Sequence, residues 1–230
     1  MLYLLSFTVY QTYPLNAASM APVTGTVATL LTLPLAERDA TALPRETADV
    51  QRWLDQARAG DQAAFGALVD AHRRLVFRTA YAALGRREDA EDVSQEAFIL
   101  AWRKLSSFRG DSAFRTWLVT ITWRRALDRR RTRAAWWQRL TPARDDVDPI
   151  AFVAGEAPSP EHETLARERA TRARHEIRQL SRTLRDTLLL AASGDYTYEE
   201  ISAMLGTPIG TIKWRVSEAR RIVAARMDGK

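Results

Sequence analysis

The tripeptide Gly110-Asp111-Ser112 is the part of this sequence that most invites a catalytic interpretation. A serine in a sharp turn can be the nucleophile of a hydrolase when a histidine acts as its base. None of the three histidines has a recognisable triad context: His72, His162 and His175. The same tripeptide can also cradle a phosphate or simply cap a helix, and the amphipathic stretch that follows favours a cap. We therefore expect no catalytic residue, with Asp111 as the helix cap and Ser112 in the first helical turn.

The charge balance favours an anionic partner. Lysine and arginine number 34 against 28 aspartates and glutamates, which gives a net charge of +6. Because the excess is clustered, above all in the run Arg129-Arg130-Arg131, we prefer a binding surface to evenly solvated helix faces. The chain has no cysteine, which excludes disulfides, thiolate zinc sites and cysteine nucleophiles. We expect no metal and no cofactor, and a reducing, cytoplasmic location fits this composition.

The first 45 residues differ from the rest of the chain. Residues 1–10 are apolar, but polar residues and a proline follow before the roughly 20 apolar residues that a membrane-spanning helix needs. No lysine or arginine precedes Arg38, so the basic start of a secretory signal is missing. We predict a disordered N-terminal extension over residues 1–45 and no insertion into a membrane.

The remaining pattern predicts an all-α fold with two small helical domains. A bundle of four helices is expected over 46–135, with breaks at Gly60-Asp61, at Gly85 and in the loop before Asp111. Prolines and the acidic residues Asp145, Asp146 and Asp148 mark a flexible linker over 136–160. A second helical domain is expected over 161–230.

The second domain ends in a pattern that is typical of a helix-turn-helix. Thr197 and Glu200 form a capping box, Gly206 ends the first helix, and Thr207 and Pro208 are predicted to begin the second. The inward positions of that helix are apolar. Its outer positions form a basic, polar surface that suits a major groove: Gly210, Thr211, Lys213, Trp214, Arg215, Ser217, Glu218, Arg220 and Arg221.

Two segments together resemble one family. The segment REDAEDVSQEAFILAWRKLSSFRGDSAFRTWLVTITWRRALDRRR resembles region 2 of bacterial extracytoplasmic-function (ECF) sigma factors, and LSRTLRDTLLLAASGDYTYEEISAMLGTPIGTIKWRVSEARR resembles their region 4. The resemblance implies a cytoplasmic subunit without catalysis of its own, which binds core RNA polymerase and directs promoter recognition, DNA melting and transcription initiation. It also implies an anti-sigma factor as a partner. The alternative from the residues alone is a stand-alone helix-turn-helix regulator with an N-terminal sensor bundle.

The resemblance assigns roles in the first domain residue by residue. Three residues on one helical face correspond to the family's contact with the clamp helices of the largest polymerase subunit: Asp92, Gln95 and Glu96. The polymerase flap is expected as a second contact of the protein. Eight residues correspond to the site for the melted minus-10 element: Lys104, Ser107, Phe108, Arg109, Gly110, Asp111, Ile121 and Arg124. Four arginines are expected on backbone phosphates: Arg125, Arg129, Arg130 and Arg131.

Within this set we predict that Phe108 stacks on an unpaired base, whereas Phe114 and Trp117 belong to the core. In the second domain the nine outer residues listed above correspond to the family's contact with the minus-35 element. Trp214 and Glu218 depart from the usual residues, so Trp214 is expected on a sugar or a thymine methyl and Glu218 on a cytosine amino group. Trp136 and Trp137 are predicted either to cover the first domain or to contact a partner.

Overall fold

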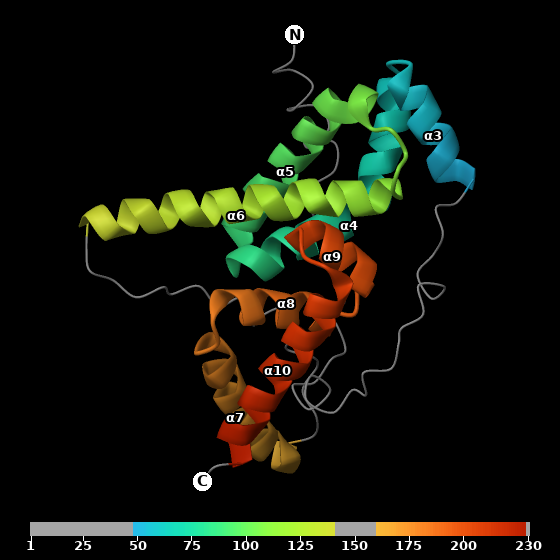
Figure 1. Ribbon diagram of the computed structural model, residues 1–230. Coiled ribbons are helices and arrows are strands. Elements are labelled where there is room, and N and C mark those ends of the chain that lie inside the picture. The colour runs from blue at the N-terminus through green and yellow to red at the C-terminus, as the bar shows by residue number, and fades with distance from the viewer. Residues whose placement is uncertain (1–47, 141–159, 229–230) are drawn as a thin grey trace. The chain divides into compact units, whose positions relative to one another are not determined.

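The computed structural model describes residues 48–140 and 160–228, and all regular structure in these ranges is helical. The all-α prediction is therefore confirmed for the described residues. They belong to two compact units, of which the first contains α3 to α6 and the second α7 to α10 (Figure 1). The predicted N-terminal extension and most of the predicted linker lie outside the described residues. No described helix has the length and apolar character that crossing a membrane requires.

The first unit consists of four α-helices and one short 3₁₀ turn. Their bounds are α3 Ala48–Arg58, α4 Gln62–Leu84, α5 Arg87–Lys104, η3 Leu105–Ser107 and α6 Phe114–Leu140. Helices α4, α5 and α6 pack on one another, and α3 packs on α4. The buried side chains lie at the helical spacing that the sequence predicts, with Leu68, Val76 and Leu118 fully buried.

The ends of α4 follow from local chemistry. The Asp61 carboxylate accepts hydrogen bonds from the backbone N–H groups of Ala63 at 2.8 Å and Ala64 at 3.2 Å, which satisfies two donors that the first turn leaves open. Gly85 ends the helix with φ 65°, a left-handed conformation that glycine adopts without steric cost. Both boundaries agree with the predicted breaks.

The start and the end of α6 differ from the prediction. The helix begins at Phe114, and Asp111 and Ser112 lie in the bend before it, so Asp111 does not cap the helix and Ser112 is not in its first turn. The N–H of Trp117 donates instead to the carbonyl of Ala113 at 3.1 Å. At the other end α6 continues to Leu140, beyond the point where the linker was predicted to begin, and its backbone includes Trp136 and Trp137.

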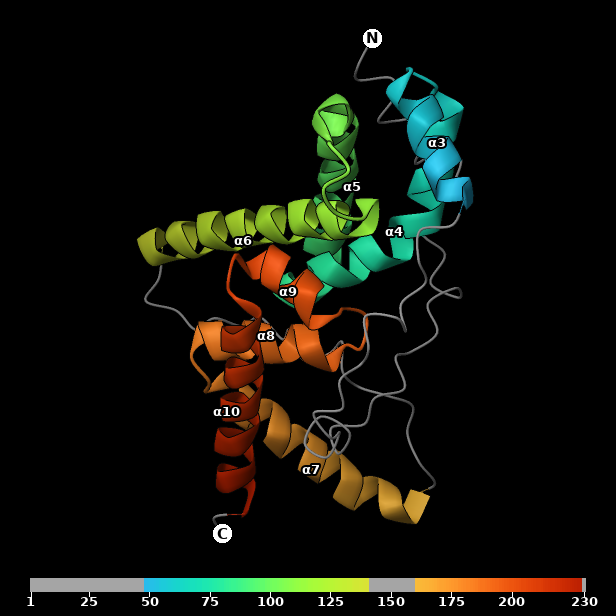
Figure 2. The ribbon, with the colours of Figure 1, turned by 45° about the vertical axis from the view of Figure 1, so that its right-hand side comes forward.

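The second unit contains α7 Pro160–Arg178, α8 Arg182–Ala192, α9 Tyr198–Leu205 and α10 Ile209–Asp228 (Figure 2). Its core is apolar and is formed mainly by α7, α8 and α10: Ala173, Ile177, Leu180, Leu188, Leu189, Ala219 and Val223. The predicted capping box is present at the start of α9. The N–H of Glu200 donates to the Thr197 hydroxyl at 3.1 Å, and the Thr197 N–H donates to the Glu200 carboxylate at 3.1 Å.

The turn between α9 and α10 is partly as predicted. Gly206 is left-handed with φ 60° and ends α9. The hydroxyl of Thr207 donates to the carbonyl of Leu205 at 3.2 Å and accepts from Arg215 at 3.3 Å. Thr207 lies two residues before the first helical residue, so it is not in the capping position. The helix begins at Ile209, and the N–H of Ile212 donates to the carbonyl of Pro208 at 3.1 Å, so Pro208 precedes the first helical residue.

Candidate nucleic-acid interface

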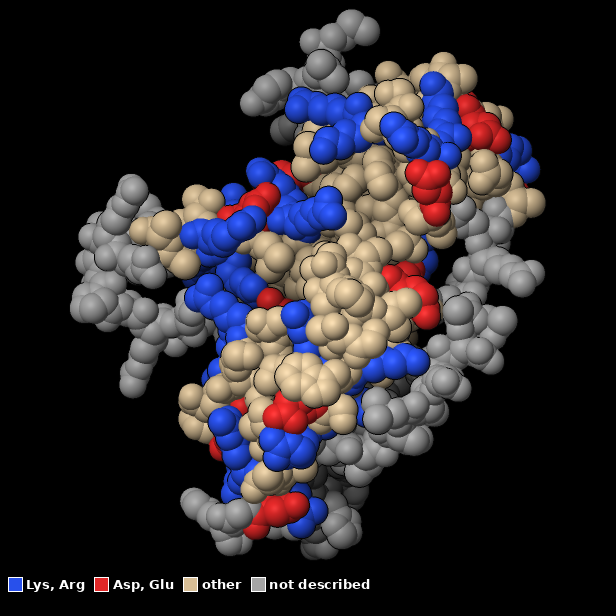
Figure 3. All heavy atoms as spheres, viewed as in Figure 1, with Lys and Arg blue, Asp and Glu red and all other residues tan. Residues whose placement is uncertain are grey.

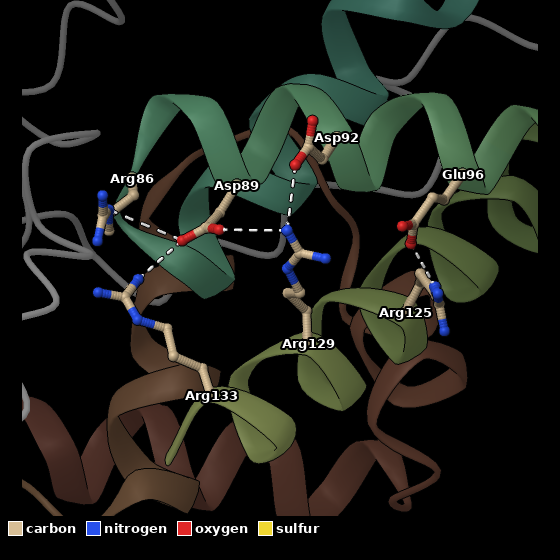
Figure 4. Close-up of polar contacts among 7 residues, drawn as sticks. All are labelled: Arg86, Asp89, Asp92, Glu96, Arg125, Arg129 and Arg133. Atoms are coloured by element: carbon tan, nitrogen blue, oxygen red, sulfur yellow. Dashed lines mark hydrogen bonds and ion pairs between the residues drawn. The ribbon is translucent and has the colours of Figure 1, made fainter. Parts of the chain in front are cut away.

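Ion pairs connect α5 to α6, and we call the residues that form them the α5–α6 seam (Figure 4). They are Asp89, Asp92 and Glu96 of α5 and Arg125, Arg129 and Arg133 of α6. The acids are three and four residues apart and the arginines four apart, so each set lies on one face of its helix. Figure 4 shows the two sets pointing toward each other.

The pairs of the seam differ in how deeply they are buried. Arg133 donates to Asp89 at 2.7 Å, and Arg129 lies 3.6 Å from Asp89 and 3.1 Å from Asp92. Arg125 donates to Glu96 at 2.5 Å. The Asp89 side chain is only 17% exposed and holds two arginines of α6, whereas the Glu96 side chain is 32% exposed and holds one. Asp89 is therefore the anchor of the seam, and the pairs of Asp92 and Glu96 lie closer to solvent.

The residues predicted to contact the polymerase are less open to solvent than the sequence predicts, because two of them belong to the seam. The sequence predicts Asp92, Gln95 and Glu96 as one exposed acidic face. In the structure Asp92 and Glu96 are paired with arginines from α6, and Gln95 is half-buried. Their partners Arg125 and Arg129 come from the set that was assigned to DNA phosphates. Two predicted interfaces therefore share one set of ion pairs.

The remaining predicted phosphate residues have different surroundings. Arg130 lies 3.5 Å from the carbonyl of Ala83, and Arg131 pairs with Asp128 one turn earlier in α6. Arg124, which belongs to the predicted minus-10 set, is exposed and has no partner among the described residues. In the space-filling view, basic side chains gather over the part of α6 toward its C-terminal end (Figure 3).

The loop between α5 and α6 presents its polar residues to solvent. Lys104, Ser107, Arg109, Gly110 and Asp111 are all exposed. The Ser107 hydroxyl donates to the carbonyl of Lys104 at 2.7 Å, and Gly110 turns the chain with φ 80°. Ile121 of the next helix is half-buried and packs against the core of the unit. The predicted minus-10 residues therefore include an exposed polar loop with Arg109 and Asp111, next to the exposed Lys104 at the end of α5.

Phe108 is the exception in this loop. Its ring is only 8% exposed, lies 5.9 Å from the Phe114 ring and 5.0 Å from the Trp117 ring, and belongs to the core cluster. Phe114 is buried and Trp117 half-buried, as predicted. In the described structure Phe108 is thus a packing residue, and its face is not available for stacking on a base. The prediction that the free Phe108 ring is open to stack on an unpaired base is therefore corrected. Its packing depends on Phe114 and Trp117 of α6, and the sequence of the loop does not indicate those contacts.

Arg58 of α3 binds the same loop through Phe108. Its guanidinium donates to the carbonyl of Phe108 and lies 5.3 Å from the centre of the Phe108 ring. It also lies 3.8 Å from Asp55, one turn earlier in its own helix. The loop is therefore held by one hydrogen bond and one cation–π contact from a helix 50 residues away in sequence.

The outer face of α10 carries an exposed aromatic ring among polar residues. Trp214 is 61% exposed and is the one large hydrophobic side chain on the surface of the described residues. Gly210, Lys213, Ser217 and Arg221 are exposed as well, and the rest of the predicted set is half-buried: Thr211, Arg215, Glu218 and Arg220. Lys213 lies 6.0 Å from the centre of the Tyr198 ring, and Arg215 donates to the Thr207 hydroxyl at 3.3 Å.

Glu218 and Arg221 form a two-bond pair on this face. The Arg221 guanidinium donates to both carboxylate oxygens of Glu218, at 2.7 Å and 2.8 Å. These hydrogen bonds lower the pKa of Glu218. Because Arg221 is exposed and Glu218 is only half-buried, the pair adds little to folding stability, and its effect is to orient Arg221.

Comparison with known proteins identifies both units. Residues 68–136 match the family Sigma-70 region 2, and residues 171–223 match Sigma-70, region 4. The chain is 36% identical over 182 residues to the ECF RNA polymerase sigma-E factor of Escherichia coli K12, which covers 75% of this chain and 91% of that protein. The RNA polymerase sigma-H factor of Pseudomonas aeruginosa is 31% identical over 179 residues, with the same coverage. The chain belongs to the ECF sigma factors.

The fold of this sigma factor is also found in a solved structure. CnrH, in complex with the cytosolic domain of CnrY, matches with a TM-score of 0.54 over 79% of this chain and 99% of that chain, at 24% identity. As a specificity subunit of RNA polymerase, this sigma factor directs promoter recognition and transcription initiation, with core polymerase and promoter DNA as its partners. The unit of α3 to α6 contains region 2, and the unit of α7 to α10 contains region 4.

Three residues of the sigma factor were missed by the sequence analysis: Asp89, Arg133 and Arg58. A signal existed for the first two, because arginines at 125, 129 and 133 repeat at the spacing of one helical face, as do the acids of α5. No local signal pointed to Arg58, whose partner is far away in sequence.

Replacement of Arg58 by alanine is expected to loosen the loop of the sigma factor. Loss of a hydrogen bond and a cation–π contact should speed amide hydrogen exchange in residues 106–113 by about tenfold. Mass-spectrometric hydrogen exchange on the full chain measures this effect. The matched control is Arg52→Ala, which removes an exposed arginine of the same helix that pairs only with Asp49 among the described residues. Equal exchange in both variants would contradict a fastening role for Arg58.

Proposed function

We propose that this sigma factor uses its two units on two promoter elements, with the loop between α5 and α6 and the start of α6 on the melted minus-10 strand and the outer face of α10 on the minus-35 duplex. The observation that carries the proposal is the helix-turn-helix of α9 and α10, whose exposed outer face is polar and basic. The exposed cations Lys104, Arg109 and Arg124, in and beside the loop of the first unit, support the minus-10 assignment. Asp92, Gln95 and Glu96 are proposed as the contact with the clamp helices of the polymerase.

The minus-10 proposal no longer depends on stacking by Phe108. The exposed side chains of Lys104, Arg109 and Arg124 supply cations for the strand, and Ser107 and Asp111 supply hydrogen-bonding groups for base edges. Gly110 leaves the backbone open to close approach, since a methyl group at this position would meet no atom within 4 Å. Phe108 supports the loop from below by packing on Phe114 and Trp117.

We further propose that the protein acts in the cytoplasm and has no catalytic activity of its own. We also propose an anti-sigma factor as a partner of this chain, as the family resemblance implies, and the solved structure of CnrH, which contains the cytosolic domain of CnrY, supports a cytosolic protein partner. The deciding experiment is run-off transcription with purified core polymerase and a candidate promoter. Initiation that depends on the added protein supports the proposal. Tight binding to duplex DNA without core polymerase, and no initiation with it, would instead favour a stand-alone regulator.

Trp214 is proposed to contact the 5-methyl group of a thymine in the minus-35 element. A helical side chain leans over the turn before it, and here that turn carries the bare Gly210 and the small Thr211, so the indole ring has room to lie against the groove. An apolar ring matches a methyl group better than it matches any polar base edge.

Substitution of deoxyuridine for one thymine of the minus-35 element, which removes only the methyl group, is expected to weaken promoter binding by the holoenzyme about fivefold. The same substitution should have no effect on holoenzyme with Trp214→Ala. Scanning each thymine in a competition binding assay measures both effects. If Trp214→Ala weakens binding while no uracil substitution does, the ring contacts the sugar-phosphate backbone instead.

A further inference from the structure

The α5–α6 seam pairs residues that the proposed function assigns to two different partners. Glu96 and Asp92 are proposed for the polymerase, and we propose their partners Arg125 and Arg129, which the family resemblance assigns to backbone phosphates, as contacts with promoter DNA. We propose that polymerase and DNA are coupled through this seam: in the free chain the acids neutralise the arginines, and a basic partner that takes the acids frees the arginines to bind phosphate. This inference rests on the proposed function.

An arginine of the seam that is paired with a carboxylate is less able to bind a DNA phosphate. Arg125 donates its Nε to Glu96 at 2.5 Å, and Arg129 approaches Asp92 at 3.1 Å, so each guanidinium has part of its donor edge engaged. A carboxylate at this distance also cancels most of the positive potential that would attract a phosphate. When a basic side chain of the polymerase pairs with the carboxylate, that cancellation is lost. The donors and the charge of the arginine then face the DNA.

The anchor of the seam keeps the two helices together during this exchange. Asp89 is the most buried of the three acids and is not among the residues proposed for the polymerase. It holds Arg133 at 2.7 Å and also lies 3.6 Å from Arg129. Arg129 therefore retains a carboxylate when Asp92 is taken, whereas Arg125 has Glu96 as its one described acidic partner. The Glu96–Arg125 pair should carry the larger part of the coupling.

The expected size of the coupling is modest and reciprocal. Exposed ion pairs change an equilibrium by a factor of about two to five each at moderate salt. Coupling between two binding sites acts equally in both directions, so DNA should strengthen polymerase binding as much as polymerase strengthens DNA binding. The factor should shrink as salt rises, because screening weakens the pair in the free chain.

The test is a gain of function in the free chain. Glu96→Gln removes the charge of Glu96 and should tighten binding of the full chain, without polymerase, to a fluorescein-labelled single-stranded oligothymidylate about threefold in low salt. Because an unfolded basic chain can also bind an anionic strand, far-UV circular dichroism of each variant is compared with that of the wild type. The matched control is Glu88→Gln, the same change in the first turn of the same helix at an exposed residue outside the seam. Fluorescence anisotropy across a salt series measures both.

A second variant shows whether the gain passes through the paired arginine. In Glu96→Gln/Arg125→Gln the gain should disappear. Equal affinities of Glu96→Gln and Glu88→Gln, or a gain that survives the loss of Arg125, would overturn the coupling. The proposed function is tested separately, since reduced initiation by Glu96→Gln in run-off transcription reports on the polymerase contact and does not depend on the free chain's affinity for DNA.

Discussion

Replacement of Phe108 by alanine is expected to lower the free energy of unfolding of the region 2 unit by about 3 kcal/mol. The ring packs on Phe114 and Trp117 and is nearly fully buried, so its removal leaves a cavity beneath the loop. Urea denaturation followed by tryptophan fluorescence measures the change. Six of the seven tryptophans lie between residues 53 and 137, so this signal reports mainly on the first unit.

The matched control for this prediction is Arg109→Ala, which alters the adjacent exposed residue of the loop. It should leave the unfolding free energy within about 0.5 kcal/mol of the wild type and weaken promoter melting. A Phe108→Ala variant with normal stability, normal polymerase binding and defective melting would contradict the packing role. In that case the ring must leave the core and stack on a base when the promoter opens.

Reversal of charge at Glu96 is expected to have the second large effect. Glu96→Arg should weaken binding to core polymerase by roughly 30-fold, because it places a positive charge against the basic partner that the acidic face is proposed to meet. It also faces Arg125 with a like charge, which should destabilise the α5–α6 packing. Binding of fluorescently labelled full chain to core polymerase, together with urea denaturation, separates the two effects.

The charge swap Glu96→Arg/Arg125→Glu is the informative companion. It restores an ion pair at the seam and should therefore recover the unfolding free energy. It should not recover polymerase binding, since the proposed docking face still carries a reversed charge. Recovery of both quantities would show that Glu96 serves only the packing of α5 on α6. The swap Asp128→Arg/Arg131→Asp, within one exposed turn of α6, is the control for a general effect of exchanged charges.

The parts of the fold that could be predicted from sequence are those that depend on neighbouring residues. The Asp61 cap, the Thr197–Glu200 capping box and the left-handed Gly85 and Gly206 each satisfy backbone groups within a few residues. The buried stripes of the helices follow from the helical period alone. The family assignment succeeded for a related reason, because its motifs are contiguous segments of sequence.

The features that sequence did not predict depend on tertiary contacts. Asp111 is a good capping residue, but α6 begins three residues after it, at Phe114. Thr207 likewise lies two residues before α10, and its hydroxyl donates to the carbonyl of Leu205. The burial of Phe108 requires two rings of α6 and Arg58 of α3, and Arg58 lies 50 residues from Phe108 along the chain. The acidic face of α5 looked open because its partners lie on α6. Local sequence propensity does not predict contacts between residues of different helices.

The two proposed interfaces share a property that follows from their residue types. Histidine is the side chain whose ordinary pKa lies between pH 5 and 8, and neither the α5–α6 seam nor the outer face of α10 contains one. His72 is buried in the first unit and His175 lies on α7. Promoter binding by the holoenzyme should therefore vary little between pH 6 and 8 at constant salt, as a filter-binding series would measure. We expect these surfaces to respond to ionic strength rather than to acidity, so any effect of protons on promoter binding would act through other residues.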